Sequence, residues 1–192
     1  MKTSESTFKV IVKLNKATIK TKDSALYVGQ KWSKEDNFII ATDESGKKVE
    51  FSDNRILTNE DSIDTTKPGI YELIYSFEGE GKTIDSNFKV TVKEDKSTIK
   101  TKNSTLYVGQ KWAEEDNFVS ATDEEGKAVP WSDNRIDSNG ATVDTTKPGS
   151  YELEYSFKGK GKVSNSSFKV TVKEDKSTIK TKNSTLYVGQ KW

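Results

Sequence analysis

The segment Tyr151–Phe157 reads YELEYSF and alternates apolar with polar side chains. Because successive side chains of a β-strand point to opposite faces of a sheet, this alternation predicts a half-buried strand. The segment Phe168–Val172, FKVTV, alternates in the same way. Weaker strand signals, separated by turn residues, occur at Thr98–Thr101, Leu106–Val108, Asn117–Thr122, Lys127–Trp131 and Ala141–Asp144. No segment carries an apolar stripe at helical spacing, so about seven short strands predict an all-β fold, an antiparallel β-sandwich.

These strands belong to a sequence repeat of 80 residues. Lys96–Trp112 and Lys176–Trp192 both read KSTIKTKNSTLYVGQKW, and Lys16–Trp32 differs from them at only a few positions. A period of this length is too long for a solenoid unit and suits a small autonomous domain. We therefore expect four parts: the tail strand of a preceding repeat at 1–15, two whole repeats at 16–95 and 96–175, and the head strand of a following repeat at 176–192.

The two aligned repeats act as controls for each other. A position that stays apolar in both copies is predicted to face the core, and one that changes from apolar to polar is predicted to face water. The first group comprises Ile39/Val119, Phe51/Trp131 and Ile63/Val143. The second comprises Ile40/Ser120, Ile70/Ser150 and Ile74/Glu154.

The composition argues against most kinds of enzyme. The 192 residues are 31% hydrophobic and 32% charged with a formal net charge of +1, and they include no cysteine and no histidine. Disulfides, thiolate zinc sites, cysteine nucleophiles and histidine general bases are therefore excluded. No apolar run is long enough to span a membrane, and the first residues do not resemble a signal peptide. We expect no catalytic residues, no cofactor and no resident metal.

The segments Asp144–Tyr155, DTTKPGSYELEY, and Asp64–Tyr75, DTTKPGIYELIY, carry a family resemblance. Together with LYVGQKW, EDNFVSATDEEGK and the closing FKVTVK, they resemble the group 3 bacterial immunoglobulin-like (Big_3-type) domain. That family occurs as tandem modules in surface proteins of Gram-positive bacteria. The resemblance implies two tandem immunoglobulin-like sandwiches and an extracellular location on the bacterial cell surface.

Two pairs of aromatic residues are the structural candidates that this resemblance implies. Tyr71 and Tyr151 each follow Pro-Gly at the start of the penultimate strand. An immunoglobulin sandwich places its tyrosine corner there, with the hydroxyl bonded to upstream backbone. Phe51 and Trp131, on the expected third strand, are candidates for the core tryptophan of such sandwiches.

Two loop motifs have both a binding and a structural interpretation. The acidic clusters at 114–116 and 123–125 raise the hypothesis of a calcium site, but they lack the spacing of a calcium loop. The first copy carries Lys34 and Ser45 at two of these positions, which favours solvated loops. The stretch Gly159–Gly161 is interpreted as a hairpin turn rather than a phosphate loop, because no helix follows it.

Lysines and tryptophans also allow two interpretations. Lys100 and Lys102 are suited to anionic polymers, or to protecting an exposed edge strand from pairing with other chains, and we favour the second. Nucleic-acid binding is not expected, because aromatic residues do not alternate with these lysines. A tryptophan follows Val-Gly-Gln-Lys in each copy, at Trp32, Trp112 and Trp192. Packing is preferred there over stacking on a sugar ring.

The sequence therefore predicts a stalk module that presents another domain away from the cell wall. Its expected partners are neighbouring repeats of the same parent chain, joined by the short linker Lys93–Ser97, which has no glycine or proline. The alternative is an adhesive module that binds a host protein or glycan through loops or an exposed strand. We expect a monomer, in which the end segments Phe8–Val12 and 176–192 either lie loosely or exchange with another chain.

Overall fold

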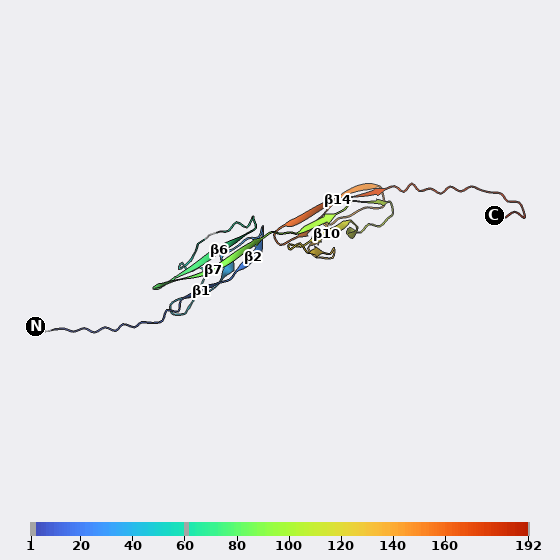
Figure 1. Cartoon of the computed structure of the whole chain (residues 1–192). Coiled ribbons are helices and arrows are strands. Elements are labelled where there is room, and N and C mark those ends of the chain that lie inside the picture. Colours follow the sequence, from blue (N-terminus) through green and yellow to red (C-terminus); the bar gives the residue numbers. More distant parts are fainter. Residues whose placement is uncertain (1–2, 60–61, 192) are drawn as a thin grey trace. The chain divides into compact units, whose positions relative to one another are not determined.

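The computed structural model describes residues 3–59 and 62–191 (Figure 1). Residue contacts divide the chain into two compact units. One consists of Met1–Ser97, Thr122–Lys127 and Lys158–Val163, and the other of Thr98–Ala121, Ala128–Phe157 and Ser164–Trp192. Neither of the short helices in the described part has the length or apolar character needed to cross a membrane.

The described residues of each repeat form seven strands and one short 3-10 helix. The first contains β1 Thr18–Thr21, β2 Ser24–Tyr27, η1 Lys34–Asn37, β3 Phe38–Thr42, β4 Lys48–Val49, β5 Ile56–Thr58, β6 Gly69–Gly79 and β7 Lys82–Lys93. The second contains β8 Thr98–Thr101, β9 Ser104–Tyr107, η2 Glu114–Asn117, β10 Phe118–Thr122, β11 Ala128–Val129, β12 Ile136–Asp137, β13 Gly149–Lys158 and β14 Val163–Lys173.

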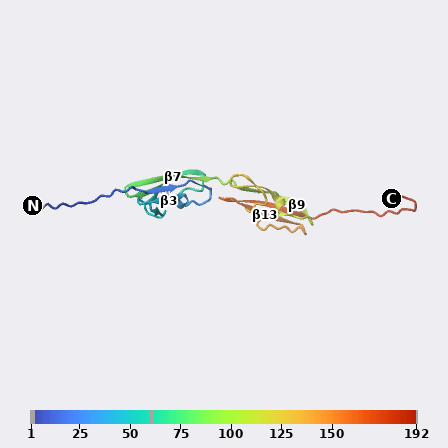
Figure 2. The same ribbon diagram turned by 90° about the horizontal axis from the view of Figure 1, so that it is seen from below.

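Within the described residues, the strands of each repeat pair with one another and build two sheets. In the first repeat the orders are β1-β3-β4 and β2-β7-β6-β5, and Figure 2 labels one strand from each of these sheets, β3 and β7. The second repeat has the same arrangement, with orders β8-β10-β11 and β9-β14-β13-β12. The prediction of two tandem immunoglobulin-like sandwiches is confirmed. The antiparallel description needs one correction, because β2 pairs parallel with β7 and β9 pairs parallel with β14.

The long hairpin of β6 and β7 provides most of the core. The two residues Glu80 and Gly81 join these strands, and Gly81 has a φ of 73°. A two-residue hairpin turn favours glycine where φ is positive. The inward side chains of this hairpin are buried, and they comprise Leu73, Tyr75, Phe77, Phe88, Val90 and Val92. The apolar residues of the alternating sequence therefore face the core, and the polar residues between them face the solvent.

One core prediction from the comparison of the repeats is wrong. Ile39 and Val119 stay apolar in both copies, yet each side chain is 52% exposed. On β3 the buried position is Ala41, and Ile39, two residues before it, lies where the register with β1 shifts and is exposed. β-branched residues favour strands even where they are exposed, so an isoleucine-to-valine change does not identify a core position. By contrast, Ile70, Ile74 and Glu154 are exposed, as the comparison predicted.

Strand prediction also failed at one place in the second repeat. Ala141–Asp144 forms no strand, although Ala141 and Val143 pack in the core. The strand lies earlier, at β12, where Ile136 and Asp137 pair with β13. A strand of two residues is too short to produce a detectable alternation.

The two end segments contain no strand. The structure assigns none to residues 3–17 or 174–191, and the apolar side chains of Phe8–Leu14 are exposed. The similar segment Phe88–Val92 lies in β7, between β6 and β2. In the described part of the chain no strand lies beside residues 8–12 in that way. The expected tail and head strands therefore do not form here, and their exchange with another chain stays a prediction.

A buried asparagine fixes the crossing of the chain between the two sheets. Asn37 is fully buried, and its Nδ2 donates to the carbonyl oxygen of Lys22 at 2.7 Å and to Ser24 Oγ at 3.0 Å. Its Oδ1 accepts a hydrogen bond from Trp32 Nε1 at 2.8 Å. Lys22 and Ser24 lie where the chain passes from β1 to β2, so this amide holds the change of sheet in place.

Candidate functional site

The tyrosine-corner candidates bond to backbone seven residues upstream. The Tyr71 hydroxyl donates to the carbonyl oxygen of Asp64 at 2.6 Å, and the Tyr151 hydroxyl donates to that of Asp144 at 2.9 Å. Each aspartate in turn accepts from the following loop, since Asp144 Oδ1 receives the backbone N–H of Thr146 at 3.0 Å. The Thr146 hydroxyl is the main cause that lowers the pKa of Asp144 to about 2. These bonds connect the loop before β6 and β13 to the first inward side chain of the strand.

Replacing Tyr151 by phenylalanine tests whether this bond stabilises the second repeat. We expect Tyr151→Phe to lower its free energy of unfolding by about 1 kcal/mol, because one hydrogen bond to backbone is lost and the ring remains. Urea unfolding followed by tryptophan fluorescence would measure the change. The first repeat, with Tyr71 intact, is the internal reference. An unchanged midpoint would show that the hydroxyl does not hold the loop.

The core-aromatic candidates lie beside the central tyrosine of each sandwich. The Phe51 ring is 5.6 Å from the Tyr75 ring, and the Trp131 ring is 5.1 Å from the Tyr155 ring. Both candidates are half-buried and pack against the core from the segment after β4 or β11. Phe51 and Trp131 therefore pack at the edge of the two cores. That they are equivalent to the core tryptophan of antibody domains stays a prediction.

The acidic loop of the second repeat is engaged in hydrogen bonds and an ion pair. Asp123 Oδ1 accepts the backbone N–H groups of Glu125 and Lys127, each at 2.9 Å. The buried Glu124 carboxylate lies 2.6 Å from Lys160 Nζ. This ammonium is the main cause that lowers the pKa of Glu124. Within residues 3–59 and 62–191, no group of three acidic side chains is arranged to hold a metal ion.

The other motifs have structural positions. Gly159–Gly161 lies between β13 and β14, and Lys100 lies on β8, the edge strand of its sheet. The Trp112 indole is half-buried, and its Nε1 donates to Asn117 Oδ1 at 2.7 Å. Trp192 lies outside the described residues.

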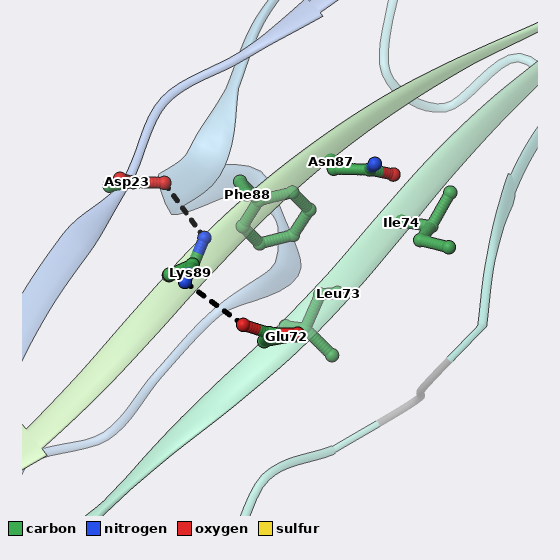
Figure 3. Close-up of a pocket in the computed structure, with 7 residues that line it drawn as sticks. All are labelled: Asp23, Glu72, Leu73, Ile74, Asn87, Phe88 and Lys89. Atoms are coloured by element: carbon green, nitrogen blue, oxygen red, sulfur yellow. Dashed lines mark hydrogen bonds and ion pairs between the residues drawn. The ribbon is translucent and has the colours of Figure 1, made fainter.

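A different surface of the first repeat has the shape and chemistry of a binding site. It is the solvent-facing side of β5, β6 and β7, here called the first-repeat outer face. Cross-strand pairs place Glu72 beside Lys89, Ile74 beside Asn87, and Leu57 beside Ser76. A hollow of about 580 Å³ lies on this face. Figure 3 shows the residues that line it: Asp23, Glu72, Leu73, Ile74, Asn87, Phe88 and Lys89.

Three apolar side chains stand exposed on this face. Ile70 is 66% exposed, Leu57 45% and Ile74 38%. In the second repeat the corresponding positions hold Ser150, Asp137 and Glu154. The two sandwiches share their strand order, so the apolar character belongs to the first repeat and is not a requirement of the fold.

Charged groups also line the hollow in a fixed arrangement. Lys89 Nζ lies 2.9 Å from Glu72 Oε1, and Asp23 Oδ1 accepts the backbone N–H of Lys89 at 2.8 Å (Figure 3). Hydrogen bonding to Glu72 is the main cause that raises the pKa of Lys89, so this ammonium stays charged at neutral pH. The hollow therefore combines aliphatic side chains with carboxylates and one paired cation.

Comparison with known proteins identifies two consecutive family domains. The model of the bacterial Ig-like domain (group 3) matches residues 19–92 and 99–172. A search of curated proteins finds no match.

Similar solved structures share little sequence with this chain. The structure of the CBM51-2 and INT domains from Clostridium perfringens ZmpB is 16% identical, with a TM-score of 0.34, over 72% of this chain and 29% of that one. Human protocadherin-24 EC1-2 is 9% identical, with a TM-score of 0.29, over 83% and 100%. A SusE-like surface-located polysaccharide-binding protein of Bacteroides thetaiotaomicron is 10% identical, with a TM-score of 0.26, over 82% and 34%. The chain thus spans about a third or less of the two bacterial structures.

Proposed function

Because the chain belongs to the bacterial Ig-like domain (group 3) family, we propose that it is a non-catalytic spacer that presents another domain away from the bacterial cell wall. Domains of this family are typical of bacterial surface proteins, so we place the chain outside the cell. The repeats extend over 16–95 and 96–175 in this proposal, and their partners are neighbouring repeats of the same parent chain.

The observation that carries the spacer proposal is the connection between the repeats. Only four residues separate the end of β7 at Lys93 from the start of β8 at Thr98. One of them, Asp95, is buried, and its carboxylate accepts the backbone N–H of Ser97 at 2.8 Å and that of Gly161 at 2.7 Å. A connection so short, with a side chain bonded at its centre, supports a linker that does not act as a free hinge.

Nuclear magnetic relaxation would test this proposal directly. We expect the amides of both repeats to report one common rotational correlation time in the natural chain. Insertion of Gly-Gly-Ser after Glu94 should shorten that time in both repeats, since they then reorient separately. If the natural chain already shows the short times of the insertion variant, the repeats move independently and a stiff spacer is excluded.

A second candidate function is adhesion, and the first-repeat outer face favours it. A pure spacer has no need for exposed aliphatic side chains at Leu57, Ile70 and Ile74 in only one repeat. Exposed apolar groups of this kind, rimmed by polar residues, mark sites of interaction. The spacer and the binding face are compatible, because one concerns the linker and the other a sheet surface.

A further inference from the structure

The first-repeat outer face is acidic as well as apolar. The alternation along β6 places Glu72 and Glu78 on the same side as Ile70 and Ile74. The pairing of Ser76 with Asp85 adds a carboxylate from β7, and Asp23 adds another from the segment between β1 and β2. Two of these four carboxylates, Asp23 and Glu72, line the hollow together with the ammonium of Lys89, and the alternation along β7 places Lys93 on the same side.

The second repeat loses three of these four carboxylates. Asn103 replaces Asp23, Lys158 replaces Glu78 and Asn165 replaces Asp85. Glu152 and Lys169 are kept and lie 3.1 Å apart, as the equivalent Glu72 and Lys89 do in the first repeat. Two of the changes that remove apolar side chains introduce carboxylates, Asp137 and Glu154, so the second-repeat face stays partly acidic while it gains the ammonium of Lys158. The combination of exposed aliphatic side chains with neighbouring carboxylates is therefore a property of the first repeat and is not found at the same positions of the second.

From this combination we infer that the first-repeat outer face docks a basic polypeptide segment that presents both aliphatic side chains and lysine or arginine to this face. Aliphatic side chains of such a segment would cover Leu57, Ile70 and Ile74, and its cations would meet Glu72, Glu78 and Asp85. The inference rests on the adhesive candidate and not on the spacer role. It names the class of partner, which is a basic, aliphatic polypeptide.

The same chemistry disfavours other occupants. A second copy bound through the same face would bring two sets of carboxylates together, and like charges across an interface are costly. Anionic lipids and anionic polymers are disfavoured for the same reason. The described side chains on the solvent side of β5, β6 and β7 include no aromatic ring on which a sugar could stack.

Labelled heptapeptides test the inference on the whole chain. The probe is KVKIKVK, and its controls are EVEIEVE, with reversed charge, and KSKSKSK, without aliphatic side chains. We expect saturable binding of KVKIKVK in fluorescence anisotropy, weakened by about 0.5 M salt because exposed charges are then screened. Each control peptide should bind at least about tenfold more weakly.

Substitutions at positions that differ between the repeats supply matched variants that suit the fold. The variant Leu57→Ser/Ile70→Ser/Ile74→Ser removes the aliphatic side chains without adding charge, and Ser150 already occupies the position of Ile70 in the second repeat. It should lower the affinity for KVKIKVK by about tenfold or more. The reverse variant changes Asp137→Leu, Ser150→Ile, Glu154→Ile, Asn103→Asp, Lys158→Glu and Asn165→Asp. It should bind two peptides per chain instead of one.

Three results would overturn the inference. The first is equal binding of KVKIKVK to the natural chain and to the triple variant. The second is equal binding of all three peptides, and the third is no saturable binding of KVKIKVK up to about 1 mM. None of these outcomes affects the relaxation test of the linker, so the spacer proposal is tested independently.

Discussion

The variant Asn37→Ala should lower the free energy of unfolding of the first repeat by about 3 kcal/mol, which is large for removal of one amide. Asn37 is fully buried and bonds to three different groups. Alanine would leave the Trp32 N–H and the Lys22 carbonyl oxygen without this partner in a dry site. Each buried polar group left unsatisfied costs about 1–3 kcal/mol.

Urea unfolding of the whole chain would measure this effect with an internal reference. The second repeat keeps Asn117 and should unfold at its usual denaturant concentration. The control variant is Asn87→Ser, because Asn87 is exposed and the second repeat carries Ser167 at that position. We expect this control to change stability by less than about 0.5 kcal/mol. If Asn37→Ala behaves like the control, the amide does not hold the crossing between β1 and β2.

The importance of Asn37 was not visible in the sequence. The motif Glu-Asp-Asn-Phe occurs in both repeats, but an asparagine next to charged residues is typical of an exposed loop. Its burial depends on three segments that meet only in the folded chain: the tryptophan before η1, the end of β1 and the start of β2. The presence of the same asparagine in both repeats, at Asn37 and Asn117, was the one indication of its importance in the sequence.

The strands of the long hairpin were predictable because alternation of apolar and polar residues over five to seven positions shows which side of a strand is buried. Tyr151, Leu153, Tyr155 and Phe157 all pack in or against the core of the second repeat. Short strands gave no comparable signal. The parallel pairing of β9 with β14 was not predicted, since four residues do not encode the direction of a partner.

The candidate site was predictable only in part. Comparison of the repeats predicted that Ile70 and Ile74 face water, and they do. Their grouping with Leu57, Asp23 and Asp85 depends on cross-strand register, which joins residues up to 66 positions apart, as in the bond from Lys89 N–H to Asp23. Register follows from the folded hairpin and is not contained in any local pattern.

Alkaline pH should unfold both sandwiches through a buried tyrosine in each. Tyr75 and Tyr155 are buried, and their hydroxyls donate to the carbonyl oxygens of Lys34 and Glu114, the latter at 2.6 Å. Burial, followed by the nearby carboxylate of Asp36, raises the pKa of Tyr75 to about 12. Burial, followed by the carboxylates of Glu114 and Asp116, raises that of Tyr155 to about 12.

The direction of the effect follows from proton binding. In the unfolded chain a tyrosine loses its proton near pH 10, and in the folded chain these two lose it near pH 12. The stabilisation is therefore complete below about pH 10 and falls as pH rises toward 12, by about 1.4 kcal/mol per pH unit for each tyrosine. We expect circular dichroism to show loss of strand structure in this interval, together with the absorbance of the phenolate.

The variant Tyr155→Phe separates the effect of ionising this tyrosine from the effect of the lysines, which also lose their protons near this pH. At neutral pH the variant should be less stable than the natural second repeat by about 1 kcal/mol or more, because the buried carbonyl oxygen of Glu114 loses its donor. Phenylalanine cannot ionise, so the variant avoids the cost of keeping a proton on Tyr155. The difference in stability between the two proteins should therefore shrink above about pH 10 and, for an initial difference of about 1 kcal/mol, change sign before pH 12. A constant difference across that interval would mean that Tyr155 does not control alkaline unfolding.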